Sequence, residues 1–434
     1  MLKAAIVADD LTGANDTGAI IAQDGYTVGT VLNLDYIDRF EGYDILSTST
    51  ESRGMEQENA YAAVKKAAAR FKTMDCKFFS KRIDSTLRGN VGAEIDAILE
   101  ELGEDTYAVV VASFPGSGRT VVGDYLMVNH VPLEKTEVSR DPISPVTISK
   151  VTDIVRLQSK HKVGYISLST VMKGHEEIKN EVLENAEDCR VIVIDARTDE
   201  DIREIAKGCI GSKLKFTAID PGPFTGSVIR ELYANDQPKG KEIVNKNKKI
   251  LCSIGSASAL TRIQIKALKN QRDPYVIKVN TLAFFKESER KEEISRVIQD
   301  VVQKKEYSDI LAVVTALDDS DVLDFSKIEG LKGKTKSECA VYIATAMAEI
   351  CEGIKEELQE EIGGVYLTGG DISAAYCERI KAIGFDVKDE VIPLAIYSEI
   401  IDKDMNRTHM ITKGGLVGDE NTLITCIDYL QDVI

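Results

Sequence analysis

The feature of this chain that most restricts its fold is a repeated alternation of short apolar runs with longer amphipathic stretches. In the first half, the runs that predict strands are residues 4–8, 76–79, 107–112, 163–168, 191–194 and 216–219. Residues 57–71 predict a helix, because their apolar side chains recur every three to four positions. Strands that alternate with helices predict a mainly parallel sheet covered by helices on both faces.

A second series of the same kind follows a polar segment, residues 234–248, which contains a proline, a glycine and several lysines. Its predicted strands are residues 249–253, 275–279, 310–314, 364–367 and 409–412, and a long helix fits residues 334–358. A chain of 434 residues is also long for a single core. We therefore expect two α/β domains, residues 1–233 and 249–434, joined by a linker at 234–248.

Composition excludes several kinds of partner. The net charge of −17 argues against nucleic acid or an anionic membrane, because both require a basic face. No apolar run approaches the roughly 18 residues of a membrane helix, and residues 1–8 are too short for a signal peptide. The eight cysteines are scattered without C-x-x-C spacing, which is typical of reduced thiols in the cytoplasm. The four histidines lack metal-ligand spacing, so a hard cation held by carboxylates and phosphates fits better than zinc.

One decapeptide, K-R-I-D-S-T-L-R-G-N at residues 81–90, carries the clearest chemistry. It lies between a predicted strand and a helix-like stretch at residues 91–102, where open α/β proteins place ligands. Arg88 could bind a carboxylate through two parallel hydrogen bonds, and Asp84 could accept hydrogen bonds from hydroxyl groups. The alternative is a salt-bridged turn in which Asp84 or Ser85 caps the next helix.

Three more polar clusters follow predicted strands or apolar runs, at residues 9–18, 48–53 and 114–120. Each alone is typical of a capped turn, but the carboxyl ends of parallel strands meet in one crevice, so together they favour a site. A group of cations there would attract an anionic ligand to this acidic protein. The side chains expected in the crevice are Asp9, Asp10, Arg53, Lys81, Arg82, Asp84, Arg88 and Arg119.

The second half contains glycine- and serine-rich turns at residues 253–258, 367–373 and 413–418. Glycines let backbone amides approach phosphates, and a helix start adds a favourable dipole. Asp371 could hold Mg²⁺ against those phosphates. No G-x-x-x-x-G-K-[ST] stretch and no complete protein-kinase signature is present, so a bound nucleotide would be held in another way.

Four motifs resemble those of the four-carbon acid sugar kinases: A-D-D-L-T-G-A-x-D-T-G, K-R-I-D-S-T-L-R-G-N, F-P-G-S-G-R-T and T-G-G-D. They occur in the order of the family and span nearly the whole chain. The resemblance implies an N-terminal domain that binds the sugar acid and a C-terminal domain that binds ATP. It also implies phosphorylation of the terminal hydroxyl of a tetronate, such as threonate, erythronate or 3-oxo-tetronate.

Carried onto this sequence, the resemblance assigns two sets of residues. Those on the substrate side would be Asp10, Arg53, Lys81, Asp84, Arg88 and Arg119. Those on the nucleotide side would be Ser256, Gly369, Gly370, Asp371, Gly414 and Gly415. Two departures lie in the nucleotide half: Ile372 replaces the family's threonine, and Leu394 follows Pro393 where a glycine is common.

The expected mechanism uses Arg88 and Lys81, together with Arg53, to neutralise the substrate carboxylate. Asp84 or Asp10 would orient the hydroxyl and accept its proton, and spacing does not rank the two. Mg²⁺ and the glycine turns would hold the triphosphate. The expected partners are therefore a small anionic sugar acid and ATP, and the sequence is also compatible with a homo-oligomer.

Two alternatives stay open. One is a phosphatase with an aspartyl nucleophile, although that chemistry usually needs D-x-D, and the side chains of Asp9 and Asp10 are expected to point to opposite sides. The other is a non-catalytic sugar-acid sensor whose nucleotide half has changed at Ile372 and Leu394. The sequence does not identify the tetronate or its stereoisomer.

Overall fold

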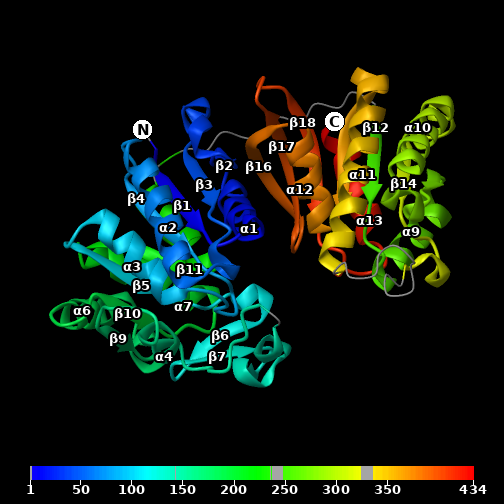
Figure 1. The fold of residues 1–434 in the computed structure, drawn as a ribbon. Helices are drawn as coiled ribbons and strands as arrows, with labels where there is room; N and C mark the ends of the chain where they lie inside the picture. Colours follow the sequence, from blue (N-terminus) through cyan, green and yellow to red (C-terminus); the bar gives the residue numbers. More distant parts are fainter. Residues whose placement is uncertain (1, 142, 235, 237–247, 324–335) are drawn as a thin grey trace. The chain divides into compact units, whose positions relative to one another are not determined.

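The computed structural model describes residues 2–141, 143–234, 236, 248–323 and 336–434. The chain divides into two compact units, Met1–Lys239 and Gly240–Ile434, which are blue to green and green to red in Figure 1. The predicted linker lies almost entirely outside the described residues, so its boundaries stay a prediction. Each unit is an α/β structure, which confirms the predicted fold class.

The first unit contains a parallel sheet in the order β2-β3-β1-β4-β11-β5-β10-β9. Its strands are β1 (Ala4–Ala8), β2 (Val28–Val31), β3 (Ile45–Ser49), β4 (Phe78–Arg82), β5 (Thr106–Val110), β9 (Val163–Ile166), β10 (Val191–Ile194) and β11 (Lys215–Asp220). The chain passes from β3 to β4 across β1, so the direction of winding reverses there. In open parallel sheets such a reversal marks the ligand-binding crevice.

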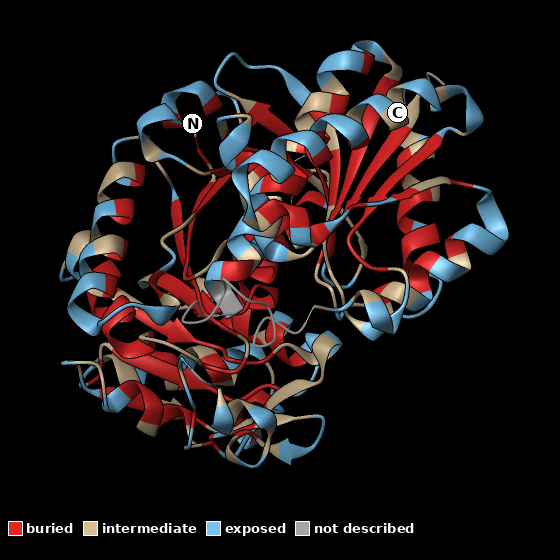
Figure 2. Ribbon diagram, turned by 45° about the vertical axis from the view of Figure 1, so that its right-hand side comes forward, coloured by how far each residue is buried: buried red, intermediate tan, exposed pale blue. Residues whose placement is uncertain are grey.

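Helices cover this sheet. They are α1 (Leu11–Ala22), α2 (Gln57–Lys72), α3 (Val91–Leu102), α4 (Val151–Arg156), α5 (Leu168–Val171), α6 (His175–Ala186), α7 (Asp199–Gly211) and α8 (Pro223–Leu232). The α2 helix buries the apolar stripe expected from its spacing, including Val64 and Phe71. In Figure 2 the strands are red and the helices are red toward the sheets and pale blue outward, so the core lies between these layers.

A small antiparallel sheet in the first unit was not predicted. Its strands are β6 (Arg119–Val122), β7 (Tyr125–Val128) and β8 (Val131–Pro132). A tight turn joins β6 to β7, with positive φ at Gly123 and Asp124. Arg119, expected in a loop at the crevice, therefore begins a strand of this separate sheet.

The second unit has strands in the order β13-β14-β12-β15-β18-β17-β16, parallel as far as β18 and antiparallel beyond it. They are β12 (Lys249–Ile254), β13 (Tyr275–Lys278), β14 (Ile310–Val314), β15 (Ile362–Thr368), β16 (Ala382–Ile392), β17 (Ala395–Asp402) and β18 (Arg407–Lys413). Its helices are α9 (Ala259–Arg272), α10 (Glu287–Gln303), α11 (Lys336–Leu358), α12 (Gly370–Arg379) and α13 (Thr422–Val433).

The β16–β17 hairpin was not predicted from the sequence. It follows α12, which begins at Gly370 and ends before β16. The hairpin turn contains Leu394 with φ of 66°, a left-handed conformation that favours glycine. The glycine common at this place in the family is therefore explained by the turn, and Leu394 adopts the same backbone at some cost.

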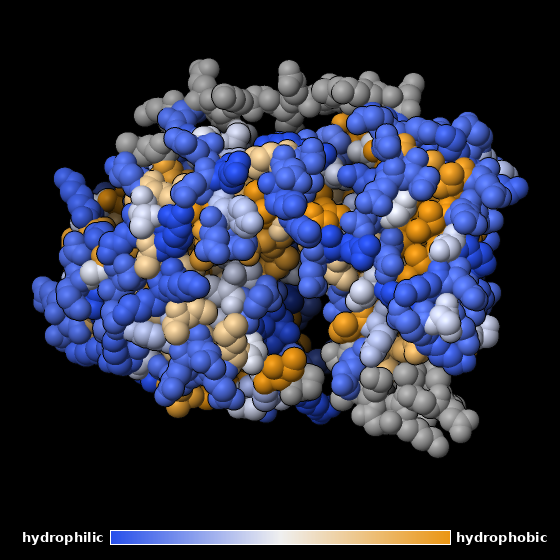
Figure 3. All heavy atoms as spheres, turned by 45° about the horizontal axis from the view of Figure 1, so that its top comes forward, coloured by the Kyte–Doolittle hydropathy of each residue, from blue (hydrophilic) through white to orange (hydrophobic). Residues whose placement is uncertain are grey.

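The cysteine side chains are unpaired and mostly buried, as the sequence predicts. All eight cysteines are free, and every one except Cys76 is buried. Among the helices of the described residues, none is long and apolar enough to cross a membrane. The face drawn in Figure 3 is mainly hydrophilic, with apolar residues in separate groups.

Candidate functional site

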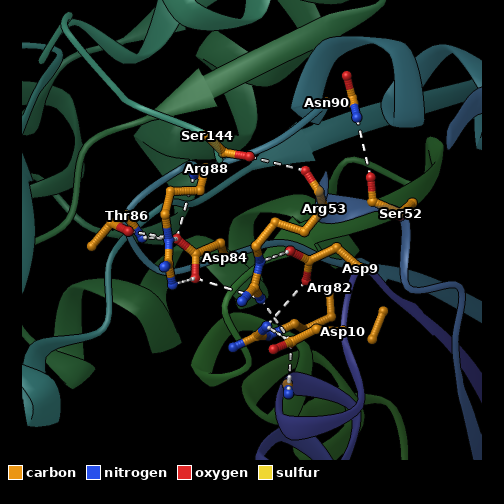
Figure 4. A network of polar contacts seen from close by, with 12 residues as sticks. Asp9, Asp10, Ser52, Arg53, Arg82, Asp84, Thr86, Arg88, Asn90 and Ser144 are labelled. Carbon is orange, nitrogen blue, oxygen red and sulfur yellow. Dashed lines mark hydrogen bonds and ion pairs between the residues drawn. The ribbon is translucent and has the colours of Figure 1, made fainter. Parts of the chain in front are cut away.

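Most of the predicted side chains of the first unit converge at the carboxyl ends of β1, β3 and β4, as Figure 4 shows. Asp9 and Asp10 follow β1, and Arg53 lies in the short helix η2 (Ser52–Gly54) after β3. Arg82 is the last residue of β4, and the loop from β4 to α3 carries Asp84 and Arg88. The parallel register places these strand ends side by side, which explains why the residues meet.

Asp9 and Asp10 bind the same two arginines. Arg82 Nη1 lies 3.1 Å from Asp9 Oδ1 and 2.8 Å from Asp10 Oδ1. Arg53 Nε lies 2.7 Å from Asp9 Oδ2, and its Nη2 lies 2.7 Å from Asp10 Oδ1. The expectation that these carboxylates point to opposite sides is wrong, because β1 ends at Ala8 and Asp10 already caps α1.

Arg88 forms two parallel hydrogen bonds with Asp84, each 2.9 Å long, and lies 3.2 Å from the carboxylate of Asp141. Burial alone would raise the pKa of Asp84, but hydrogen bonds from Arg88 and the charges of Arg53 and Arg88 hold that pKa well below its usual range. Asp84 is therefore a firmly ionised carboxylate whose main role here is to orient Arg88.

Lys81 does not present a free ammonium group to a ligand in this structure. The residue is completely buried, its Nζ lies 2.6 Å from Glu94 Oε2, and it also donates to the carbonyl of Arg82. Sequence reasoning missed Glu94, whose only signal was a carboxylate on the apolar face of α3. The expected contact of Lys81 with the substrate carboxylate is thus replaced by an internal ion pair.

The carboxylates of this cluster outnumber its guanidinium groups, which corrects the expected surplus of cations. Carboxylates of Asp9, Asp10, Asp84 and Asp141 face the guanidinium groups of Arg53, Arg82 and Arg88. A guanidinium has five N–H groups, however, so donors remain. In the described contacts, Arg53 Nη1 has no partner, and each Nη of Arg88 keeps a second N–H group.

Arg119 is not joined to this cluster by any described ion pair. Its guanidinium donates to the carbonyl of Ser117, within its own turn, and its Nε is buried without a partner among the described atoms. Its role on the substrate side stays a prediction.

A cavity of about 320 Å³ adjoins the cluster. Arg53, Leu87 and Asn90 line it together with residues 143–148. Asn90 donates to the carbonyls of Ser52 and Met55, and this fixes the turn that carries Arg53. A space of this size is typical of small-molecule sites.

The glycine turns of the second unit also come together, at the carboxyl ends of β12, β15 and β18. Gly369 has φ of 107° and donates to the carbonyl of Lys413. A Cβ on Gly415 would lie 2.3 Å from Ser256 Oγ, so only glycine fits there. Ser256 Oγ accepts hydrogen bonds from Ser258 and Thr261, so its own proton can be donated to a ligand.

One of the two family departures, Ile372, lies beside these turns. Ile372 is buried, and its Cδ1 would lie 2.4 Å from a Cβ on Gly255, so it packs beneath the first turn. Asp371 is exposed in the first turn of α12. Among the described residues, no group of three or more His, Cys, Asp or Glu side chains could hold a metal ion.

Comparison with known proteins agrees with this division. A family model described as "Sugar-binding N-terminal domain" matches residues 4–228, and one described as "Nucleotide-binding C-terminal domain" matches residues 251–423. The chain belongs to the four-carbon acid sugar kinase family.

Two curated relatives match the chain over nearly its full length. It is 42% identical to the D-erythronate kinase of Heliobacterium modesticaldum, over 99% of this chain and 97% of that protein. It is 27% identical to the D-threonate kinase of Salmonella typhimurium, over 100% of this chain and 99% of that protein.

Solved structures show the same fold. A protein titled a putative tRNA synthase from Salmonella typhimurium has a TM-score of 0.83 at 19% identity, with 98% of this chain and 99% of that chain covered. Haemophilus influenzae protein HI1011 has a TM-score of 0.81 at 20% identity, with 98% and 100% covered. The sugar-binding and nucleotide-binding matches fall in separate units of this chain.

Proposed function

We propose that this protein uses ATP to phosphorylate the terminal hydroxyl of a four-carbon sugar acid, and that D-erythronate is the first substrate to test. The observation that supports this most is the arginine–aspartate cluster in the unit that matches the sugar-binding model. It offers unused guanidinium N–H groups for a carboxylate and carboxylate oxygens for hydroxyl groups. The relative at 42% identity is a D-erythronate kinase, which favours that substrate.

Arg88 and Arg53 would bind the substrate carboxylate. Both are partly exposed, at 31% and 21% of the side chain, whereas Arg82 is buried at 7%. The two hydrogen bonds from Arg88 to Asp84 fix the orientation of the guanidinium group. A ligand would therefore bind a donor that is already oriented, without the entropic cost of ordering it. Arg82 would instead fix Asp9 and Asp10.

Asp10 is the better proton acceptor of the two candidates. All its described contacts use Oδ1, which leaves Oδ2 for a substrate hydroxyl. Asp84 uses both oxygens for Arg88, and its strongly lowered pKa makes it a weak base. In phosphoryl transfer, positioning of the attacking hydroxyl matters more than early proton removal, which suits an aspartate.

The nucleotide would bind at the turns of the second unit. Ser256, Gly369, Gly370, Gly414 and Gly415 offer hydroxyl and amide donors for phosphates. Asp371 would hold Mg²⁺, which is usually bound by one or two carboxylates together with substrate phosphates and would neutralise their charge. A single exposed aspartate fits that manner of binding and would not hold the metal without the nucleotide.

The two alternatives are supported less well. In a phosphatase, Asp9 or Asp10 would be the nucleophile, but both carboxylates are neutralised by Arg53 and Arg82. In a sensor, Ile372 and Leu394 would mark a lost nucleotide site, but one packs under a turn and the other forms a hairpin.

The proposal includes the expected cellular location and the expected partners. Eight free cysteines fit a cytoplasmic location, and the net charge of −17 fits the absence of a nucleic-acid partner. A homo-oligomer stays a prediction.

The test is ADP formation by the purified protein with ATP, Mg²⁺ and a panel of four-carbon acids. The panel should contain D-erythronate, D-threonate, L-threonate and 3-oxo-tetronate, and phosphorus NMR should locate the phosphate on the terminal oxygen. D-erythronate should give the highest kcat/KM. No ADP formation with any acid, combined with tight binding of one, would support the sensor.

A further inference from the structure

The loop at residues 414–418 is held through its carbonyl oxygens. Lys413 Nζ donates to the carbonyl oxygens of Gly414, at 2.8 Å, and Val417, at 3.3 Å. Ser258, the N-cap of α9, and Thr261 in its first turn donate to the carbonyl oxygen of Gly415 at 2.6 and 3.0 Å. Gln264 donates to Val417 at 3.2 Å and to Asp419 at 2.7 Å.

This arrangement dictates the direction of the amide groups. In a trans peptide, the C=O of one residue and the N–H of the next point in opposite directions, and the described chain has no cis peptide. The N–H groups of Gly415 and Gly418 therefore point away from Lys413. In the described hydrogen bonds, neither these two nor the N–H of Leu416 has an acceptor. Successive amides of this kind form a binding site for an anion.

Lys413 itself is an unneutralised charge. It is 3% exposed, and among the described residues no carboxylate forms an ion pair with it. Burial lowers the pKa of Lys413 to about 8, because the buried ammonium group has lost its water. Its carbonyl partners compensate for that loss less well than an anion would. An anion bound in front of the loop would offset this cost.

We propose that Lys413 is a positioning residue for the phosphates of the bound nucleotide. From behind the 414–418 loop it directs the amides of Gly415 and Gly418 toward the phosphates and supplies a positive charge. This inference rests on the proposed nucleotide-dependent function and adds a residue to those assigned to the nucleotide side from the sequence.

The surroundings of Lys413 make its titration simple to follow. Cys426 of α13 interacts with it, but burial raises the pKa of that thiol to about 12. Cys426 in turn adjoins Tyr366 of β15, whose pKa burial also raises. The carboxylate of Asp419 is directed to Asn421 and Thr422 within its own turn. Between pH 7 and pH 9, Lys413 is thus the group beside the loop that changes charge.

The experiment is calorimetric titration of ADP into the full-length protein at pH 7 and pH 9, with Lys413→Met as the variant. Lys355→Met is the matched control, because Lys355 is half-buried, has a pKa lowered by burial, and binds Thr408 at the opposite end of β18. Lys413→Met should weaken ADP binding at least tenfold at pH 7, and Lys355→Met should not change it. Wild-type affinity should fall severalfold between pH 7 and pH 9, and that of Lys413→Met should not.

The inference would be overturned if folded Lys413→Met bound ADP normally, or if its affinity fell with pH as much as that of the wild type. Either result would leave the proposed nucleotide function intact. If Lys413→Met does not fold, Gln264→Leu replaces it, since this change removes both carbonyl contacts of Gln264 and keeps the charge of Lys413. Gln264→Leu should bind ADP more weakly and keep the fall with pH. Unchanged binding by Gln264→Leu with no pH dependence in the wild type would overturn the inference. No ADP binding by the wild type would instead overturn the proposed nucleotide function as well.

Discussion

Lys81 and Glu94 form an ion pair of 2.6 Å, and their side chains are only 0% and 2% exposed. The pair joins the end of β4 to the buried face of α3 beneath the arginine–aspartate cluster. Lys81 also contributes to the lowered pKa of Asp9: burial would raise that pKa, but the charges of Lys81, Arg82 and Arg53 outweigh it. The pair therefore supports the cluster from inside the fold.

Lys81→Met should lower the free energy of unfolding by about 3–5 kcal/mol, because it leaves the Glu94 carboxylate buried without a partner. The double variant Lys81→Met/Glu94→Leu should recover much of that loss, since both charges are gone. Urea unfolding measures both. A Lys81→Met protein of normal stability with a raised KM for the sugar acid would show that Lys81 faces the substrate after all.

Arg88→Ala should raise the KM for the sugar acid by about 10- to 150-fold, the range expected for a hydrogen bond to a charged group worth about 1.5–3 kcal/mol. The KM for ATP should barely change. Arg70→Ala is the control, because Arg70 makes a similar two-bond pair with Asp38 at an exposed position. If Arg88→Ala bound the acid normally and lost ATP, the two units would have the opposite roles.

Asp84→Asn should lower the free energy of unfolding at pH 7 by about 2–3 kcal/mol, because Arg88 and Arg53 lose an ionised partner. The folded pKa of Asp84 lies below its unfolded value of about 3.9. Its contribution is therefore fully present at pH 7 and is lost as the pH falls below about 5. The difference between wild type and variant should stay nearly constant from pH 7 to about pH 5 and then shrink as the pH falls further in urea unfolding. An Asp84→Asn difference that is independent of pH would refute the assignment.

Gly370→Val should fold normally, since nothing lies within 4 Å of a Cβ at that position. It should weaken ADP binding by about tenfold or more, because the branched side chain would occupy the space where a phosphate approaches the backbone. Sugar-acid binding should remain measurable by calorimetry. Gly211→Val, at an exposed helix end in the first unit, is the control. A folded Gly370→Val protein with wild-type ADP affinity would remove the nucleotide assignment from this turn.

Asp371→Asn should raise the Mg²⁺ concentration needed for half-maximal activity by about tenfold, because it removes a charge and keeps the shape. The measurement is the initial rate as a function of Mg²⁺ at saturating ATP and sugar acid. Asp432→Asn, at an exposed position on α13, should leave the curve unchanged. An unaltered curve for Asp371→Asn would mean that the metal is held without this carboxylate.

Much of the fold was predictable because buried parallel strands are short, continuous apolar runs. Residues 310–314 form β14 and residues 91–102 form α3 with the bounds expected from the sequence. The β16–β17 hairpin escaped prediction because half-buried antiparallel strands mix apolar and polar residues. In β16 burial is continuous only over part of the strand, so the pattern lacks a clear period.

The sequence alone determined which polar side chains follow which strand, and hence that Asp9, Arg53 and Asp84 belong to one crevice. Only the tertiary structure decided how they pair. Asp9 and Asp10 converge on shared arginines because strand alternation ends where the helix cap begins. Lys81 turns inward because packing of α3 on the sheet brings Glu94 to its ammonium group. Such pairings depend on contacts between elements, which local patterns of hydrophobicity do not record.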